Sequence, residues 1–165
     1  MSKKAAVFFL ALIFVVGAAF IQTKHFFAVE GIVPNAVLAI LIAYAAFAPE
    51  VLLYTASALL GASLIRFNIG FDFVAFAVFI IAFAALFTLP RLPGRRAINM
   101  VVTVIFATLG VYAISDPGFI REHFVTVLWE MVYNSVVSLG AYLILLFVET
   151  HAPQTIRSQS GRSHF

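Results

Sequence analysis

Long apolar segments alternate with short polar breaks along almost the whole chain. A bilayer core about 30 Å thick needs about 20 mainly apolar residues per helix, so each apolar segment reaches or approaches the length of one membrane span. The pattern therefore predicts an all-α integral membrane protein, with a compact bundle of six transmembrane helices in one membrane domain, residues 1–148. The predicted spans are residues 5–21, 32–48, 51–67, 72–89, 97–114 and 124–148.

Helix breakers and charges mark the turns between these segments. Pro49-Glu50 divides residues 32–67, which are too long for one span and suit a tight hairpin. The uncharged part of the third segment, Val51–Ile65, would span only about 22 Å at 1.5 Å per residue. A re-entrant hairpin over 32–67 therefore stays open as an alternative. The other turns are predicted at residues 66–72, 90–96 and 115–118.

Positive residues predict the orientation of the six spans. If both ends of the chain lie on one face, that face holds seven Lys and Arg residues and the opposite face holds three. Cytoplasmic loops of membrane proteins carry the excess of Lys and Arg, so we expect both termini in the cytoplasm. The seven are Lys3, Lys4, Arg91, Arg95, Arg96, Arg157 and Arg162, and the three are Lys24, Arg66 and Arg121.

Composition supports the membrane assignment. Hydrophobic residues make up 64% of the chain and charged residues 10%, whereas soluble domains have about 45–50% and about 25%. The net charge of +3 lies in short loops and tails, where it sets orientation rather than indicating a nucleic-acid partner. The chain has no cysteine, which excludes disulfides and thiolate ligands.

The two ends of the chain differ in character. The first apolar segment follows Lys3 and Lys4 as in a signal peptide, but it is longer than a usual signal core, so we expect a retained helix. Residues 149–165 show no apolar periodicity and are expected to form a disordered, basic cytoplasmic tail.

Enzyme signatures are missing from the sequence. It contains no G-x-S-x-G, H-E-x-x-H, Walker or G-x-G-x-x-G motif, and its four histidines lack ligand spacing. Few ionisable residues fall within the predicted spans, which argues against an intramembrane proton relay. We therefore expect a protein that is not an enzyme and has no metal or cofactor.

One polar stripe interrupts the last predicted span. Glu130, Asn134 and Ser138 follow one another at intervals of four residues and so share one face of a helix. A charge at mid-bilayer costs about 2.5–3.5 kcal/mol on insertion scales, so such a stripe should face protein or water. Two interpretations stay open: an interfacial Glu130 beside Trp129 and Tyr133, or a contact with another helix or a partner.

Small residues gather on one face of the third segment. Ser57, Ala58, Gly61 and Ala62 would allow close helix approach, as would Ala39, Ala43 and Ala46 in the second segment. Packing within the bundle and docking of a partner are both open, and packing is favoured.

The polar break between the first two apolar segments resembles a motif of a known protein family. Ile21-Gln22-Thr23 closes the first segment and Gly31-Ile32-Val33-Pro34-Asn35 opens the second; both resemble the rod shape-determining protein MreD family. Its members are similar in size, with a first helix that ends in Leu/Ile-Gln-Ser/Thr and a second that begins Gly-Ile/Val-x-Pro-Asn/Asp. A looser similarity covers about residues 3–148 and includes Glu130 with Asn134.

The same break has a structural interpretation. Pro34 at the start of a helix loses no hydrogen bond, because the first amides are unpaired there. Asn35 is placed to bind those free amides, and Gln22 to bond across to the turn. We therefore expect the segment to fasten the first two helices together.

The resemblance implies a fold, a function and a place in the cell. It implies a six-helix bundle with both termini inside, resembling the S-component-like fold, in the bacterial inner membrane. It also implies a non-catalytic scaffold of the cell-wall elongation machinery, which binds an MreC-like membrane protein and, indirectly, MreB-like filaments and cell-wall synthases. The residues expected to make partner or interhelical contacts are Gln22, Asn35, Arg66, Asp72, Glu130, Asn134 and Ser138.

One position departs from the family pattern. Such sequences usually end the third span with Gly-x-x-x-Asp, whereas here Gly61 is followed at the matching place by Ile65-Arg66. The acidic residue has become basic or has shifted to Asp72, with which Arg66 is placed to form a local ion pair.

A second function class fits the same size and span number. The substrate-binding S subunit of an energy-coupling-factor transporter also has six spans, and it needs a cavity with convergent polar groups for a vitamin or other small molecule. The predicted outer loops offer few such groups, chiefly Gln22, Lys24, Arg66, Asp72 and Glu130.

Overall fold

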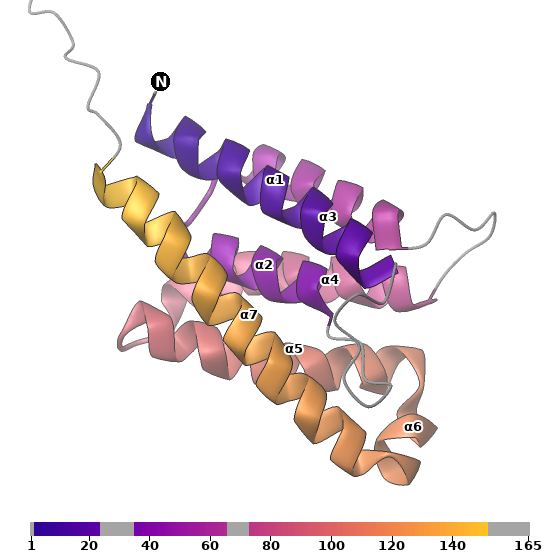
Figure 1. The fold of residues 1–165 in the computed structure, drawn as a ribbon. Coiled ribbons are helices and arrows are strands. Elements are labelled where there is room, and N and C mark those ends of the chain that lie inside the picture. Colours follow the sequence, from indigo (N-terminus) through magenta and orange to yellow (C-terminus); the bar gives the residue numbers. More distant parts are fainter. Residues whose placement is uncertain (1, 24–34, 66–72, 152–165) are drawn as a thin grey trace, which may run out of the picture.

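The computed structural model describes residues 2–23, 35–65 and 73–151, and all regular structure in these residues is helical (Figure 1). The order is α1 (Lys3–Thr23), α2 (Ala36–Ala45), α3 (Val51–Ile65), α4 (Phe73–Thr88), η1 (Leu89–Arg91), α5 (Arg96–Ser115), α6 (Pro117–Glu122) and α7 (Phe124–His151). The all-α class predicted from the sequence is confirmed.

Four stretches are long and apolar enough to cross a membrane: α1, α4 continued by η1, α5 and α7. The other two predicted spans contain shorter helices. With ten residues, α2 is about 15 Å long, about half of a bilayer core. It ends at Ala45, where we expected a span to 48, because the chain turns at once toward Pro49.

Two boundaries near the end of the chain also differ from expectation. The last helix continues to His151, three residues beyond the predicted limit at 148. The predicted loop after Ser115 contains α6, which Asp116 caps by accepting a hydrogen bond from the Phe119 amide at 3.2 Å. Residues 152–165 of the predicted tail lie outside the described residues.

Helix α2 is the centre of the bundle. Every residue from Val37 to Ala45 is buried, and α2 contacts α1, α3, α4, α5 and α7. In Figure 1, α7 runs diagonally across the bundle, and it packs against α1, α2 and α5. A helix that is apolar all round belongs in such an enclosed position.

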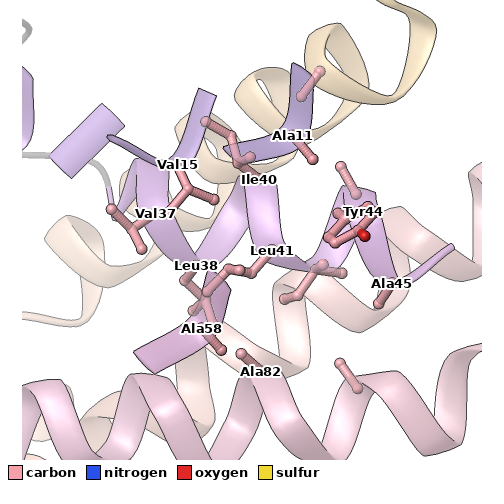
Figure 2. Close-up of a cluster of buried hydrophobic side chains, with 14 of the residues drawn as sticks. Ala11, Val15, Val37, Leu38, Ile40, Leu41, Tyr44, Ala45, Ala58 and Ala82 are labelled. Carbon is pink, nitrogen blue, oxygen red and sulfur yellow. The ribbon is translucent and has the colours of Figure 1, made fainter. Parts of the chain in front are cut away.

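The core combines branched side chains from α2 with small residues from its neighbours. Figure 2 shows Val15, Leu41, Ala58 and Ala82 converging from α1, α2, α3 and α4. A Cβ atom on Gly61 would lie 2.8 Å from Val37 Cγ1 and 2.9 Å from Val15 Cγ1. The small-residue face of α3 therefore packs against the chain's own helices, as favoured from the sequence.

Tyr54 fastens three helices inside this core. Its hydroxyl group lies 3.1 Å from the Leu41 carbonyl oxygen of α2 and 2.9 Å from the Ala82 carbonyl oxygen of α4. The side chain is fully buried on α3. A buried phenol needs such a partner, and here it finds two in neighbouring helices.

The turn between α2 and α3 is tight. The Phe47 and Ala48 amides donate to the Tyr44 and Ala45 carbonyls, each at 3.0 Å. Ala48 has φ of +46°, a left-handed conformation that residues with a Cβ rarely adopt. The strained residue directly precedes Pro49, where the sequence predicted a hairpin.

Large apolar side chains cover the outside of the bundle. Leu52 is 79% exposed and Phe106 68% exposed, and similar residues project from every membrane-length helix. Water does not tolerate apolar surface on this scale. Buried polar residues and an apolar exterior together identify a multi-pass membrane protein.

Candidate functional site

The polar stripe of α7 faces the interior of the bundle. Asn134 and Ser138 are fully buried and Glu130 is 5% exposed, whereas the adjoining Trp129 is 50% exposed. Of the two interpretations left open by the sequence, the structure therefore places these side chains against other helices rather than at an exposed interface. Because α7 contacts α5 and α2, the stripe lies in the middle of the helix packing.

Glu130 joins α7 to α5. The Tyr112 hydroxyl group of α5 donates a hydrogen bond to Glu130 Oε2, and Asn134 Nδ2 lies 3.5 Å from Glu130 Oε1. The Tyr112 ring stacks on Phe119 of α6, with ring centres 5.0 Å apart and planes 6° apart. Each carboxylate oxygen thus has a donor, as burial of such a group requires.

Asn134 makes a second connection between the same helices. Its Nδ2 donates to Thr108 Oγ1 at 3.0 Å, and Thr108 Oγ1 donates in turn to the Val104 carbonyl at 2.9 Å. Thr108 and Asn134 are both buried. The contacts of Tyr112, Glu130, Asn134 and Thr108 therefore form one hydrogen-bonded network. Together with the buried Ser138 one turn further along α7, we call these residues the α5–α7 polar cluster.

Two atoms of this cluster have no hydrogen-bond partner in the described part of the chain. They are Asn134 Oδ1 and Ser138 Oγ, one helical turn apart on α7. A buried polar atom without a partner costs about 1–3 kcal/mol. The cluster thus keeps hydrogen-bonding capacity that its own side chains do not use.

The start of α2 is fastened to α1 and to the polar cluster. Gln22 Oε1 accepts a hydrogen bond from the Val37 amide at 3.4 Å, and Asn35 Oδ1 caps α2 by accepting from the Leu38 amide at 3.2 Å. The backbone amide of Asn35 also interacts with Glu130. Two features that are far apart in the sequence, the Gln22–Asn35 break and the α7 stripe, therefore meet at Asn35.

Several predicted site residues cannot be placed in this arrangement. Arg66 and Asp72, with their expected ion pair, and the Gly31–Pro34 part of the motif lie outside the described residues. Of the seven residues predicted to make contacts, the structure brings Asn35, Glu130, Asn134 and Ser138 together and links Gln22 to the same helix start.

Sequence reasoning missed the partners of the stripe on α5. Thr108 and Tyr112 are four residues apart, the same interval that separates Glu130 from Asn134. Residues four apart are neighbours on one helix, so Thr108 and Tyr112 form a polar face on α5, as Glu130 and Asn134 do on α7. This pattern was available in the sequence, although the pairing of the two helices was not.

The side chains of the cluster form hydrogen bonds that hold neighbouring helices together. In the part of the chain that the structure describes, no three His, Cys, Asp or Glu side chains lie close enough to hold a metal ion. Glu130 and Asn134 bind groups of α5, and Asn35 binds the start of its own helix.

The fold and the polar cluster together define a polytopic helical membrane protein whose helices are joined by buried polar contacts. Comparison of the chain with protein-family models, curated proteins and solved structures gave no match.

Proposed function

We propose that this protein is a non-catalytic membrane scaffold of the bacterial cell-wall elongation machinery, of the kind that the MreD family provides. The observation that supports the proposal most is the meeting of Asn35 and Glu130 at the start of α2. Both belong to the pattern that resembles the family, one from each end of the chain. An interaction between two residues that both carry the resemblance is expected if the chain shares the architecture of that family.

The proposed arrangement has six spans with both termini in the cytoplasm of a bacterial inner membrane. The seven-to-three distribution of Lys and Arg supports this orientation. In it, α2 and α3 cross or enter the membrane as a pair; the four longer helices pack around α2, and α3 lies against α1 and α4. The proposed partner is an MreC-like membrane protein, which connects the scaffold to cell-wall synthases and, indirectly, to MreB-like filaments.

Co-purification tests this proposal. The tagged full-length chain and an MreC-like protein from the same bacterium would be co-expressed and extracted in mild detergent, with an unrelated single-span protein as the control. We expect the MreC-like protein, and not the control, to be retained in an apparent stoichiometric complex. Equal recovery of both proteins would contradict the proposal.

A second candidate is the substrate-binding S subunit of an energy-coupling-factor transporter. Its support is the unpartnered pair of buried acceptors, Asn134 Oδ1 and Ser138 Oγ, since a small polar ligand would supply the missing donors. A thermal-shift screen with vitamins separates the two candidates. Stabilisation by one vitamin that Asn134→Leu abolishes would favour the transporter subunit.

A further inference from the structure

A cleft opens at the end of the bundle where α1 begins and α7 ends. It has a volume of about 280 Å³. That volume is just below the range of about 300–1,000 Å³ for pockets that hold whole small molecules, so it suits a headgroup-sized ligand. The lining comes from the first turns of α1, the α2–α3 turn and the last turn of α7, and its polar members are Ser2, Lys3, Lys4, Tyr44, Glu50 and Glu149.

Charges of both signs face this cleft. Lys3 and Lys4 come from the first turn of α1, Glu50 directly precedes α3, and Glu149 belongs to the last turn of α7. Lys3 and Glu149 are half-buried, whereas Lys4 and Glu50 are exposed. Three separate elements thus place two ammonium groups and two carboxylates around one opening.

Apolar and aromatic groups complete the lining. Val7, Phe8, Phe47 and Leu53 adjoin the charged residues. Tyr44 is buried, stacks on Tyr54 with ring centres 5.7 Å apart, and lies close enough to Glu50 for an electrostatic interaction. The cleft thus combines a charged rim with an apolar wall.

We propose that this cleft binds the headgroup of a zwitterionic phospholipid that carries a primary ammonium group. Lys3 and Lys4 would bind the phosphate, and Glu50 and Glu149 would accept hydrogen bonds from the ammonium. The apolar wall would hold the first part of the acyl chains. An anionic lipid would bind the two lysines, but its negative headgroup would also face the two carboxylates. The charge pattern therefore favours a zwitterionic lipid.

A membrane lipid is favoured over a soluble compound by the position of the cleft. In a membrane-embedded bundle, the first turn of α1 and the last turn of α7 lie at the level of the lipid headgroups. The bound lipid would fasten α1, the α2–α3 turn and α7 to one another. The inference depends on the membrane class of the protein and is independent of the proposed scaffold function.

Lipid binding to the purified full-length chain tests this inference. The protein in detergent would be titrated with phosphatidylethanolamine, phosphatidylcholine, phosphatidylglycerol and soluble phosphoethanolamine. Bound lipid would be counted by native mass spectrometry and stabilisation followed by Tm. Phosphatidylcholine has the same phosphate but no N–H donors, and phosphatidylglycerol has no ammonium. We expect phosphatidylethanolamine to bind about tenfold more tightly than phosphatidylcholine or phosphatidylglycerol. Such a factor corresponds to the loss of one hydrogen bond between charged groups.

Two pairs of substitutions locate the site. Glu50→Gln with Glu149→Gln should remove the preference for phosphatidylethanolamine, and Lys3→Gln with Lys4→Gln should weaken all three lipids. The matched control is Arg121→Gln with Glu122→Gln on α6, at the far end of α7, where both side chains are exposed. Because the lysines also guide membrane orientation, the carboxylate pair and the wild-type lipid series provide tests that do not depend on them.

The expected result is selective phosphatidylethanolamine binding that is lost in the Glu50/Glu149 variant and kept in the Arg121/Glu122 variant. Equal binding of all three lipids by the wild-type chain would overturn the proposal. Equal loss in the control variant would also overturn it, as would saturation of the site by soluble phosphoethanolamine at the same concentration as the lipid.

Discussion

The Tyr112 hydroxyl group of α5 donates a hydrogen bond to the Glu130 carboxylate of α7, inside a bundle whose outer surface is apolar. The two residues are 18 positions apart and are separated by α6. Their contact fixes the rotation of both helices about their axes, because turning either helix would move a polar group toward lipid.

Removal of the Tyr112 hydroxyl should therefore weaken the fold. Tyr112→Phe leaves the buried carboxyl group short of a donor, which costs about 1–3 kcal/mol of unfolding free energy. The matched control is Tyr133→Phe on α7, whose side chain is half-buried. Unfolding in detergent measures both variants. Equal stability of the two would show that the Tyr112 hydroxyl contributes nothing to the fold.

Asn134 and Ser138 should respond differently to loss of their polar atoms. Asn134→Leu removes the hydrogen bond to Thr108 and should destabilise the bundle by about 1 kcal/mol, within the range for intramembrane polar contacts. Ser138→Ala removes a buried oxygen that has no partner among the described residues, so it should be neutral or stabilising. A clear loss of stability in Ser138→Ala would show that Oγ binds a buried water or another ligand.

Gly61 should be the least replaceable glycine of the helices. Gly61→Ala places a methyl group within 3 Å of Val15 and Val37, so α3 must move away from α1 and α2. We expect a loss of about 1–3 kcal/mol, as for overpacked cores. Gly140→Ala on α7 is the control, because a Cβ there meets nothing within 4 Å. A Gly61→Ala variant as stable as Gly140→Ala would contradict this packing.

Ala48 should gain stability when its Cβ is removed. Ala48→Gly relieves the left-handed conformation at φ +46°, worth about 1 kcal/mol, and loses little else because the residue is exposed. Ala46→Gly, at the right-handed end of α2, is the control and should destabilise. The thermal midpoints of both variants in detergent measure the difference. Destabilisation by Ala48→Gly would argue against the strained turn.

The proposed orientation makes a separate prediction. Reporter fusions after Arg96 and at Phe165 should report the cytoplasm, and a fusion at Lys24 should report the outside, because Lys and Arg are concentrated on the predicted inner face. Inserting the fusions into the full chain keeps the later spans in place. A periplasmic signal at Phe165 would rule out six spans with both ends inside.

The sequence predicted features that depend on local pattern. Pro49 marked the turn between α2 and α3, the four-residue interval placed Glu130, Asn134 and Ser138 on one face, and Asn35 was recognisable as a helix cap. Each follows from helix geometry or backbone chemistry within a short stretch. The membrane class followed from the long apolar segments and from the composition.

Features that depend on the packing of neighbouring helices could not be predicted from the sequence. Helix α2 is so uniformly apolar that no face stands out, so its central position could not be read from periodicity. Tyr54 gave no local sign that its hydroxyl group reaches carbonyls on two other helices. The contact of Asn35 with Glu130 could be predicted only by knowing that α2 packs against α7. The residue pattern of one sequence does not show which helices pack together.

The enclosure of α2 has a consequence for biogenesis. Helix α2 is synthesised before α7, yet α7 forms part of its enclosure. Until the ribosome has released α7, one side of α2 lacks its final neighbour and the Asn35 amide lacks Glu130. A chain that stops before α7 therefore leaves α2, in the middle of the bundle, without part of its enclosure. Closure of the bundle around α2 therefore has to wait for the synthesis of α7.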